Sequence, residues 1–391
     1  MFKKKKLLEF IKKTKKKFKE KKLEIHSPKL LKEDYISLKK CLDTNYISTF
    51  GPYVKSFEKK IIKITKSKYV IAVNSGTSAL HIALLTLGIK KGDEVLMPSL
   101  NFVASANSTI YCGATPHFID SEEITLGADP IKLDNYLKKN TFIKKGYCYN
   151  KITKKKIAAL IAIHVFGHPC KIQSLKLICS KYKILIIEDA AEGLGSLFKN
   201  KHVGTFGNIG ILSFNGNKII STGAGGAILT NSKKLEKFAR NLVNVGKINH
   251  KWEYKYSKVG FNYRMPNLNA SLGLSQIRFL NKRLIKKRQL FDFYKKALKD
   301  FPELRLLKEP ENAKSNYWLQ TIILNLDIKK YKNRILKLFN DNDFQSRPLW
   351  QLLSDMSHLK NCPRMKIITS KRLFNQRNPK VYFTRSKKQY C

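Results

Sequence analysis

The stretch SFNGNKIISTGAGG, residues 213–226, places a lysine where it could do covalent chemistry. Lys218 lies between a short apolar run that ends at Phe214 and a turn rich in glycine, and Ser213 precedes it by five positions. A lysine amine can attack a carbonyl carbon, and neighbouring glycines leave room for a bound ring or phosphate. Because lysine is abundant in this chain, Lys218 is informative only together with the residues that accompany it.

Two earlier segments carry groups that suit the same chemistry. In AVNSGTSAL (72–80), Gly76 permits close backbone approach, and Thr77 and Ser78 offer hydroxyls beside the N–H groups of a helix start, which is an anion site. In LIIEDAAEGLGS (185–196), Asp189 ends an apolar run, where a carboxylate is costly unless a cation pairs with it. Ordinary helix capping is the alternative for the hydroxyls and for Asp189.

One cofactor explains the three segments together. A phosphate-binding turn, a buried carboxylate and a later Ser-x4-Lys suit pyridoxal 5′-phosphate (PLP). Lys218 would bond to the cofactor aldehyde, Asp189 would keep the pyridine nitrogen protonated, and the turn with Ser213 would hold the phosphate. The sequence therefore predicts a PLP enzyme.

Strands must bring these residues together. Short apolar runs alternate with helical patterns at 69–73, 94–98, 116–120, 157–165, 183–189 and 210–214. Such runs are typical of a parallel sheet covered on both faces, with ligands at the carboxyl ends of the strands. After about Met265 a long helical stretch leads to a strand-like 321–326 and a helix-like 332–343, which indicates a smaller α/β domain.

The order of the motifs resembles a known family. The segments NSGTSAL, PSLNFVASAN, EDAAEGLGS, SFNGNKIISTGAGG and GFNYRMPNLNA follow one another as in the DegT/StrS-type sugar aminotransferases of PLP fold type I, and the resemblance covers about residues 30–365. It implies a large, doubly wound, mostly parallel seven-stranded sheet domain and a smaller C-terminal α/β domain. We expect a basic extension over 1–25, a PLP-binding domain over 26–262 and a small domain over 263–391.

The resemblance also implies roles for individual residues. Lys218 would hold the cofactor, Asp189 would pair with the ring nitrogen, and Glu192 would lie near the ring hydroxyl, where relatives often have Gln. The remaining residues that the resemblance places against the cofactor are Gly76, Thr77, Ser78 and Ser213 at the phosphate and Phe102 on the ring face. Asn262 would reach the phosphate of the neighbouring subunit, which implies a homodimer with shared active sites.

Three further residues would lie near the substrate. His164 is part of a matching HVFG motif, and Tyr46 and Trp350 belong to segments (43–61 and 346–365) that approach the nucleotide-sugar in relatives. The alternative for His164 is a hydrogen-bonded core histidine, and the alternative for Phe102 is a core phenylalanine.

The family resemblance implies a reaction. An amino donor, commonly glutamate, would supply nitrogen for the C4 keto group of a nucleotide-linked 4-keto-6-deoxy sugar used in cell-surface polysaccharide synthesis. A UDP-linked N-acetylhexosamine of the legionaminic acid or bacillosamine type is the first expectation, and a GDP-linked, perosamine-type sugar is the alternative. A branch of the fold that dehydrates its substrate carries histidine at the lysine position, so Lys218 argues against that branch.

Charge suggests a rival of another class. The 391-residue chain has a net charge of +49, which would suit a non-catalytic protein of the same fold that binds nucleic acid or a membrane surface. We expect no specific nucleic-acid partner, because no helix-turn-helix, zinc finger or aromatic-basic platform is visible. Residues 1–22 are expected to be mainly solvated and partly disordered, with a lipid-touching surface helix as the alternative.

Composition and the end of the chain complete the expectations. Seven scattered cysteines without CxxC spacing favour a reducing cytoplasm, with no disulfide framework and no metal site. The segment 370–391, SKRLFNQRNPKVYFTRSKKQYC, departs from the family pattern as a basic tail without an acidic residue. This tail puts the last helix of the small domain in doubt, and an aminotransferase inactivated by it is a third hypothesis.

Overall fold

A mostly parallel sheet forms the centre of the computed structural model, which describes residues 4–325 and 331–374 and the backbone of 380–383. Its seven main strands lie in the order β1-β11-β10-β7-β6-β2-β3, and only β11 runs against its neighbours. The bounds are β1 Tyr69–Val73, β2 Glu94–Pro98, β3 Thr115–Ile119, β6 Lys156–Ile163, β7 Leu185–Asp189, β10 Ile209–Ser213 and β11 Gly226–Thr230. The expected seven-stranded α/β sheet is confirmed.

The sheet exceeds the expectation by a hairpin. Strands β4 (Thr141–Lys144) and β5 (Tyr147–Asn150) pair with each other, and β5 adds to the beginning of β6, so that the complete sheet has nine strands among the described residues. Six of the seven main strands lie at the apolar runs identified in the sequence. The seventh, β11, follows the glycine-rich turn directly and is buried along its length.

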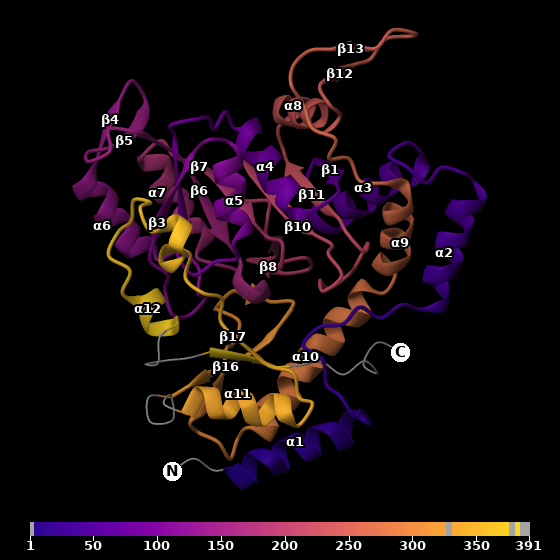
Figure 1. Cartoon of the computed structure of the whole chain (residues 1–391), viewed down its shortest axis with the longest axis vertical. Coiled ribbons are helices and arrows are strands. Elements are labelled where there is room, and N and C mark those ends of the chain that lie inside the picture. The colour runs from indigo at the N-terminus through magenta and orange to yellow at the C-terminus, as the bar shows by residue number, and fades with distance from the viewer. Residues whose placement is uncertain (1–3, 326–330, 375–379, 384–391) are drawn as a thin grey trace.

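Helices α3 to α8 pack along the large sheet, whereas α9 packs on α3 and α2 packs on α9 (Figure 1). Their bounds are α2 Lys32–Asp43, α3 Pro52–Thr65, α4 Gly76–Thr86, α5 Ala104–Tyr111, α6 Pro130–Asn140, α7 Ile172–Lys181, α8 Lys233–Val243, α9 Asn267–Ile277 and α12 Thr369–Phe374. The hydrophobic residues of β6 and β7 are buried almost without exception, because helices shield the sheet from water. Within the described residues no helix is both long and apolar enough to cross a bilayer.

Smaller sheets surround this core. A four-stranded sheet has the order β14-β16-β18-β17, and shorter pairings form the three-stranded β15-β8-β9 and the hairpin β12-β13. The bounds are β8 Leu197–Phe198, β9 Lys201–His202, β12 Lys247–Ile248, β13 Lys255–Tyr256, β14 Leu304–Leu306, β15 Ala313–Lys314, β16 Gln320–Leu324, β17 Arg347–Pro348 and β18 Lys380–Phe383. In Figure 1, β12 and β13 project from one end of the molecule, and α1 lies at the opposite end.

The N-terminal segment is folded against the rest of the chain. Helix α1 (Lys4–Phe18) buries Phe10 between rings from α10 (Leu280–Ala297) and α11 (Lys332–Asp341), with centroids 6.1 Å from Tyr294 and 6.3 Å from Phe339. The other apolar side chains of α1 in this second hydrophobic cluster are Leu7, Ile11 and Phe18. The expectation of a mainly solvated, partly disordered extension is therefore wrong, because helical periodicity gathers these side chains on one face that a neighbouring surface covers.

The two hydrophobic clusters do not follow the division made from sequence. Buried residues of α9 and of the segment 349–373 join the large cluster, although 263–391 is the predicted small domain. Asp120, at the end of β3, accepts hydrogen bonds from the backbone N–H groups of residues 368–370 and so fixes the start of α12. The proposed boundaries at 25 and 262 stay predictions, and most of the basic tail (375–379 and 384–391) lies outside the described residues.

Candidate active site

One cavity collects most of the residues identified in the sequence. Its volume is about 340 Å³, which is within the size range of small-molecule sites. It lies where β7 and β10 end and where α4 begins, as expected for an open α/β sheet. The predicted residues that line it are Gly76, Thr77, Phe102, Asp189, Glu192, Ser213, Lys218 and Trp350.

The N-terminus of α4 forms one wall. Ser75 caps the helix, and its Oγ accepts a hydrogen bond from the backbone N–H of Ser78 at 3.0 Å. A side chain at Gly76 would place Cβ 2.9 Å from Cβ of Ser213, so only glycine allows the helix start to approach β10 this closely. The first turn of α4, which includes Thr77, and Ser213 therefore line the same part of the cavity, and a helix N-terminus with hydroxyl groups beside it suits a phosphate.

Lys218 faces this cavity from the turn after β10. Its Nζ lies 3.5 Å from Oε1 of Glu192 and 4.0 Å from the centroid of the Trp318 ring, and its side chain is 14% exposed. The indole N–H of Trp318 donates to the carbonyl oxygen of Asn217 at 2.7 Å, which fixes the ring against the turn. The amine is thus held between a carboxylate and an aromatic face, at a cavity large enough for a ligand.

Asp189 is a buried carboxylate that lacks a cation in contact with it. Its Oδ2 accepts from Ser105 Oγ at 3.2 Å, and its Oδ1 accepts from the backbone N–H of Ala191 at 3.1 Å. Burial raises the pKa of Asp189 above its ordinary value, although these donors and the charge of Lys218 act in the opposite direction. In the described part of the chain no Lys or Arg nitrogen lies within 4.0 Å of it.

The local structure also rules out the capping alternative for Asp189. The residues after β7 form successive turns rather than a helix, so this carboxylate does not begin a helix. A protonated ring nitrogen would supply the cation that Asp189 lacks, and the N-terminus of α4 and Lys218 line the same cavity. The residues present fit PLP.

Glu192 is the second unusual acid of the cavity. Burial raises the pKa of Glu192 to about 7, with the charge of Lys218 and the backbone N–H of Phe166 opposing the shift. The Phe166 N–H donates to Oε2 of Glu192 at 2.8 Å, and the other carboxylate oxygen, Oε1, accepts from Lys218 Nζ. Glu192 can therefore exchange a proton near neutral pH beside Lys218.

Two predicted phosphate or substrate residues do not reach the cavity. Ser78 Oγ is hydrogen-bonded to Ser75 Oγ at 2.8 Å and does not line the cavity, so its contribution is to the helix cap. His164 is completely buried: its Nε2 lies 3.0 Å from Oε2 of Glu188, and its Nδ1 accepts from the backbone N–H of Cys170. These contacts agree with the alternative of a hydrogen-bonded core histidine, because both ring nitrogens are used in the core.

Two others lie on the outside of this chain. Tyr46 is exposed and packs its ring edge-on against Phe50, with centroids 5.8 Å apart. Asn262 is exposed, and its backbone forms an isolated antiparallel β-bridge with the backbone of Asn244. Neither lines the cavity. A role for Asn262 in the site of a neighbouring subunit stays a prediction.

Sequence reasoning missed Trp318 and Ser105. Trp318 is about a hundred positions from Lys218 and belongs to none of the five motifs. Its only signal in the sequence was its residue type, since the chain has three tryptophans. Ser105 lies within PSLNFVASAN, three positions after Phe102, and this spacing on a helix start could have indicated it. Phe102 itself is 52% exposed at the cavity mouth, so the core alternative for it is wrong.

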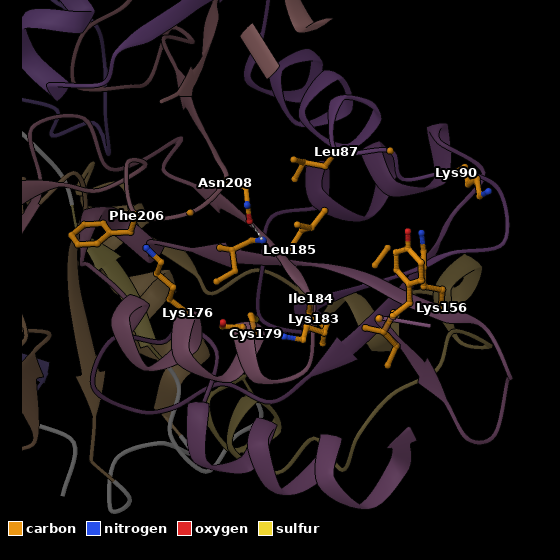
Figure 2. A pocket seen from close by; sticks show the side chains of 18 residues that line it. Leu87, Lys90, Lys156, Lys176, Cys179, Lys183, Ile184, Leu185, Phe206 and Asn208 are labelled. Carbon is orange, nitrogen blue, oxygen red and sulfur yellow. Dashed lines mark hydrogen bonds between the residues drawn. The ribbon is translucent and has the colours of Figure 1, made fainter. Parts of the chain in front are cut away.

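A larger hollow exists at the opposite ends of the strands. Its volume is about 810 Å³, and Figure 2 shows Lys90, Lys156, Lys176 and Lys183 around it, near the beginnings of β6 and β7. These four are among 18 lining residues, which is close to the share of Lys and Arg in the whole chain, 77 of 391. Composition alone accounts for this basic hollow, whereas the smaller cavity has a specific arrangement of unlike groups.

The fold and the cavity together define a PLP enzyme of fold type I. Residues 28–373 match the DegT/DnrJ/EryC1/StrS aminotransferase family, and the chain belongs to this family. It is a PLP-dependent aminotransferase.

Individual relatives agree with this assignment. The chain is 34% identical over 328 residues to the GDP-perosamine synthase of Vibrio cholerae, with 83% of this chain and 84% of the relative covered. It is 36% identical to the GDP-perosamine synthase of Escherichia coli O157:H7, with 76% and 77% covered. Helicobacter pylori PseC, an aminotransferase involved in the biosynthesis of pseudoaminic acid, has the same fold, with a TM-score of 0.82 at 22% identity over 93% of this chain and 94% of that one.

Proposed function

We propose that this protein transfers an amino group from an amino acid, with glutamate as the first candidate, to the C4 keto group of a nucleotide-linked 4-keto-6-deoxy sugar. The observation that carries the proposal is Lys218, whose amine lies between Glu192 and Trp318 in a cavity that also holds Asp189 and the phosphate-type N-terminus of α4. The names of the two relatives favour a GDP-linked sugar as the first substrate to test, ahead of the UDP-linked N-acetylhexosamine.

The residues would divide the chemistry among them. Bound PLP supplies a carbonyl group for the amine and a ring that stabilises negative charge at the adjacent carbon. Asp189 would hold the ring nitrogen, Ser213, Thr77 and the N–H groups of α4 would hold the phosphate, and Phe102 would cover the ring. In the first half of the transfer Lys218 Nζ would take a proton from the amino-acid carbon that bears the nitrogen, and in the second half it would deliver a proton to C4 of the sugar.

A third hollow, which adjoins the cofactor cavity, supports a large anionic substrate. It has a volume of about 460 Å³ and shares Asn217, Trp318 and Trp350 with the cofactor cavity. Arg347 and His26 also line it, so a cation lies next to the aromatic walls. A diphosphate could lie against Arg347 while the sugar reaches Lys218, because guanidinium groups suit phosphate oxygens.

The test is a substrate panel. The purified holoenzyme is incubated with glutamate and, separately, with GDP-, UDP- and dTDP-linked 4-keto sugars, and products are identified by mass. We expect an amino sugar from the GDP-linked or the UDP-linked substrate, and no product with Lys218→Ala. Amination by Lys218→Ala would refute the mechanism, and cofactor retention without any transfer from glutamate would show that the enzyme has lost its activity.

We also propose a homodimer with shared sites, in which Asn262 completes the neighbour's phosphate site. Mixing Lys218→Ala subunits with Asn262→Ala subunits tests this directly. If sites are shared, each mixed dimer has one intact site, and activity returns to about a quarter of the wild-type value or less. The absence of any recovery after confirmed subunit exchange would contradict the shared site.

A further inference from the structure

Helix α1 has a charge density that the composition of the chain does not explain. Residues 1–22 contain 12 lysines and two glutamates, a net charge of +10, whereas the other 369 residues share the remaining +39. This is nearly one net positive charge for every two residues, against about one for every nine elsewhere. The segment precedes residues 28–373, the part of the chain that matches the aminotransferase family.

The structure separates the apolar and basic faces of this helix. Leu7, Phe10, Ile11, Thr14 and Phe18 are buried against the second hydrophobic cluster. The exposed residues of α1 are all charged, and they comprise Lys4, Lys5, Lys6, Glu9, Lys12, Lys13, Lys16 and Lys17. Because a helix turns 100° per residue, five of the exposed lysines lie opposite the buried face, namely Lys5, Lys6, Lys12, Lys13 and Lys16, whereas Lys4 and Lys17 lie at its two edges.

The position of α1 leaves this face accessible. The helix lies at an extremity of the chain, at the end opposite the β12-β13 hairpin (Figure 1). Among these seven lysines no ion pair with a described acidic residue is found, whereas Lys15, beside the buried face, lies 3.7 Å from Asp343. The exposed surface of α1 thus carries seven lysines and one carboxylate, Glu9.

We propose that the exposed lysine face of α1 docks the enzyme on an anionic lipid surface through charge alone. Insertion is excluded as long as α1 stays docked, because its apolar face is already buried against α10 and α11. A convex basic face without exposed aromatic side chains suits a plane of anionic headgroups. It lacks the stacking rings with which single-stranded nucleic acids are bound.

This docking surface is independent of the aminotransferase reaction, since α1 contributes nothing to the cofactor cavity. Each lysine close to an anionic bilayer contributes a factor of about five in binding, and salt weakens the attraction. Four substitutions on this face are therefore expected to weaken binding by about a hundredfold or more.

The test compares two quadruple variants of the full-length holoenzyme. One carries Lys5→Gln, Lys12→Gln, Lys13→Gln and Lys16→Gln on the exposed face of α1. The matched control changes four exposed lysines on α6 and α8 in the same way, and these are Lys138, Lys139, Lys234 and Lys237. Both variants lose four charges and keep every buried side chain, so thermal unfolding should be unchanged in both.

Binding is measured by co-sedimentation with vesicles of phosphatidylcholine alone and of phosphatidylcholine with phosphatidylglycerol. We expect the wild type and the control to bind only the anionic vesicles, to dissociate in high salt, and the α1 variant to lose binding. Equal loss in both variants would attribute binding to the total charge and overturn the proposal. Binding to duplex DNA in place of vesicles, lost only in the α1 variant, would overturn it in favour of nucleic acid.

Discussion

Two adjacent carboxylates on β7, Glu188 and Asp189, have opposite environments. Side chains alternate along a strand, so the two point to different sides of the sheet. Glu188 is completely buried and has a full set of donors, which comprise His164 Nε2 at 3.0 Å and the backbone N–H groups of Gly204, Phe206 and Gly207 at 2.8, 2.5 and 2.6 Å. Asp189 has two donors and faces the cofactor cavity.

The pKa shifts of the two acids follow from this difference. Burial alone would raise the pKa of Glu188, but the hydrogen bonds and charge of His164 and the backbone donors hold it below its ordinary value. Burial prevails at Asp189, whose pKa is raised. Burial therefore does not distinguish a structural acid from a functional one, since both carboxylates are buried. The number of hydrogen-bond donors does distinguish them, because only the incompletely paired acid can still bind a ligand.

The largest expected effect concerns Glu188. Glu188→Gln removes the charge that His164 and three backbone donors share, so we expect a loss of roughly 3–5 kcal/mol in unfolding free energy. Urea unfolding of the cofactor-free protein measures it. Unchanged stability together with a loss of cofactor binding would mean that Glu188 has the functional role and would contradict its structural assignment.

Asp189→Asn should show the reverse pattern. The fold loses only a poorly paired buried charge, so the stability of the cofactor-free protein should stay within about 1 kcal/mol of wild type. Without the charge opposite the ring nitrogen, kcat should fall by about 10²–10³-fold, the usual result of removing one preorganised electrostatic group. Steady-state kinetics and the absorption spectrum of the bound cofactor check this, and a kcat within a few-fold of wild type would contradict the role of Asp189.

Glu192 should give the protein a stability that depends on pH with the sign opposite to Glu188. Its pKa of about 7 exceeds the ordinary glutamate value of 4.5, so the folded protein holds a proton that the unfolded chain has released between these pH values. The stability of the cofactor-free protein should therefore decrease by on the order of 3 kcal/mol as pH rises through this window. Denaturant midpoints across pH measure the slope.

The control for this slope is Glu192→Gln, which cannot titrate. It should remove the decrease between pH 4.5 and 7 and leave the contribution of Glu188. Because the pKa of Glu188 is lowered, that contribution is present above the unfolded pKa and is lost as pH falls through the folded one. An unchanged slope in Glu192→Gln would show that another group is responsible.

The smallest effect is expected at Trp318. Trp318→Phe keeps an aromatic face 4.0 Å from Lys218 but weakens the cation–π contact and removes the indole N–H bond to Asn217. We expect kcat/KM to fall by about two- to fivefold with little change in stability. A fall beyond a hundredfold would mean that Trp318 takes part in the chemistry rather than in positioning the amine.

Much of the cofactor cavity was predictable because its groups lie at the ends of recognisable strands. Ser213, Asp189 and the turn at Gly76 each follow an apolar run, and parallel strands bring their carboxyl ends to one edge. Strand β11 was not predicted, because its run GAILT begins with a glycine of the glycine-rich turn that follows Lys218. The two faces of β7 were also missed, although alternation along the strand separates Glu188 from Asp189.

The amino-acid order by itself determined the strands, the turn at Gly76, the lysine and the acids around it, because each depends on neighbours within a few positions. Tertiary structure alone decided which acid stays incompletely paired, that His164 belongs to the core, and that Trp318 lies against Lys218. It also decided that α1 packs its apolar face on α10 and α11 and leaves its lysines outside. These outcomes depend on surfaces that are distant along the chain, and local periodicity shows that a face is apolar without showing what covers it.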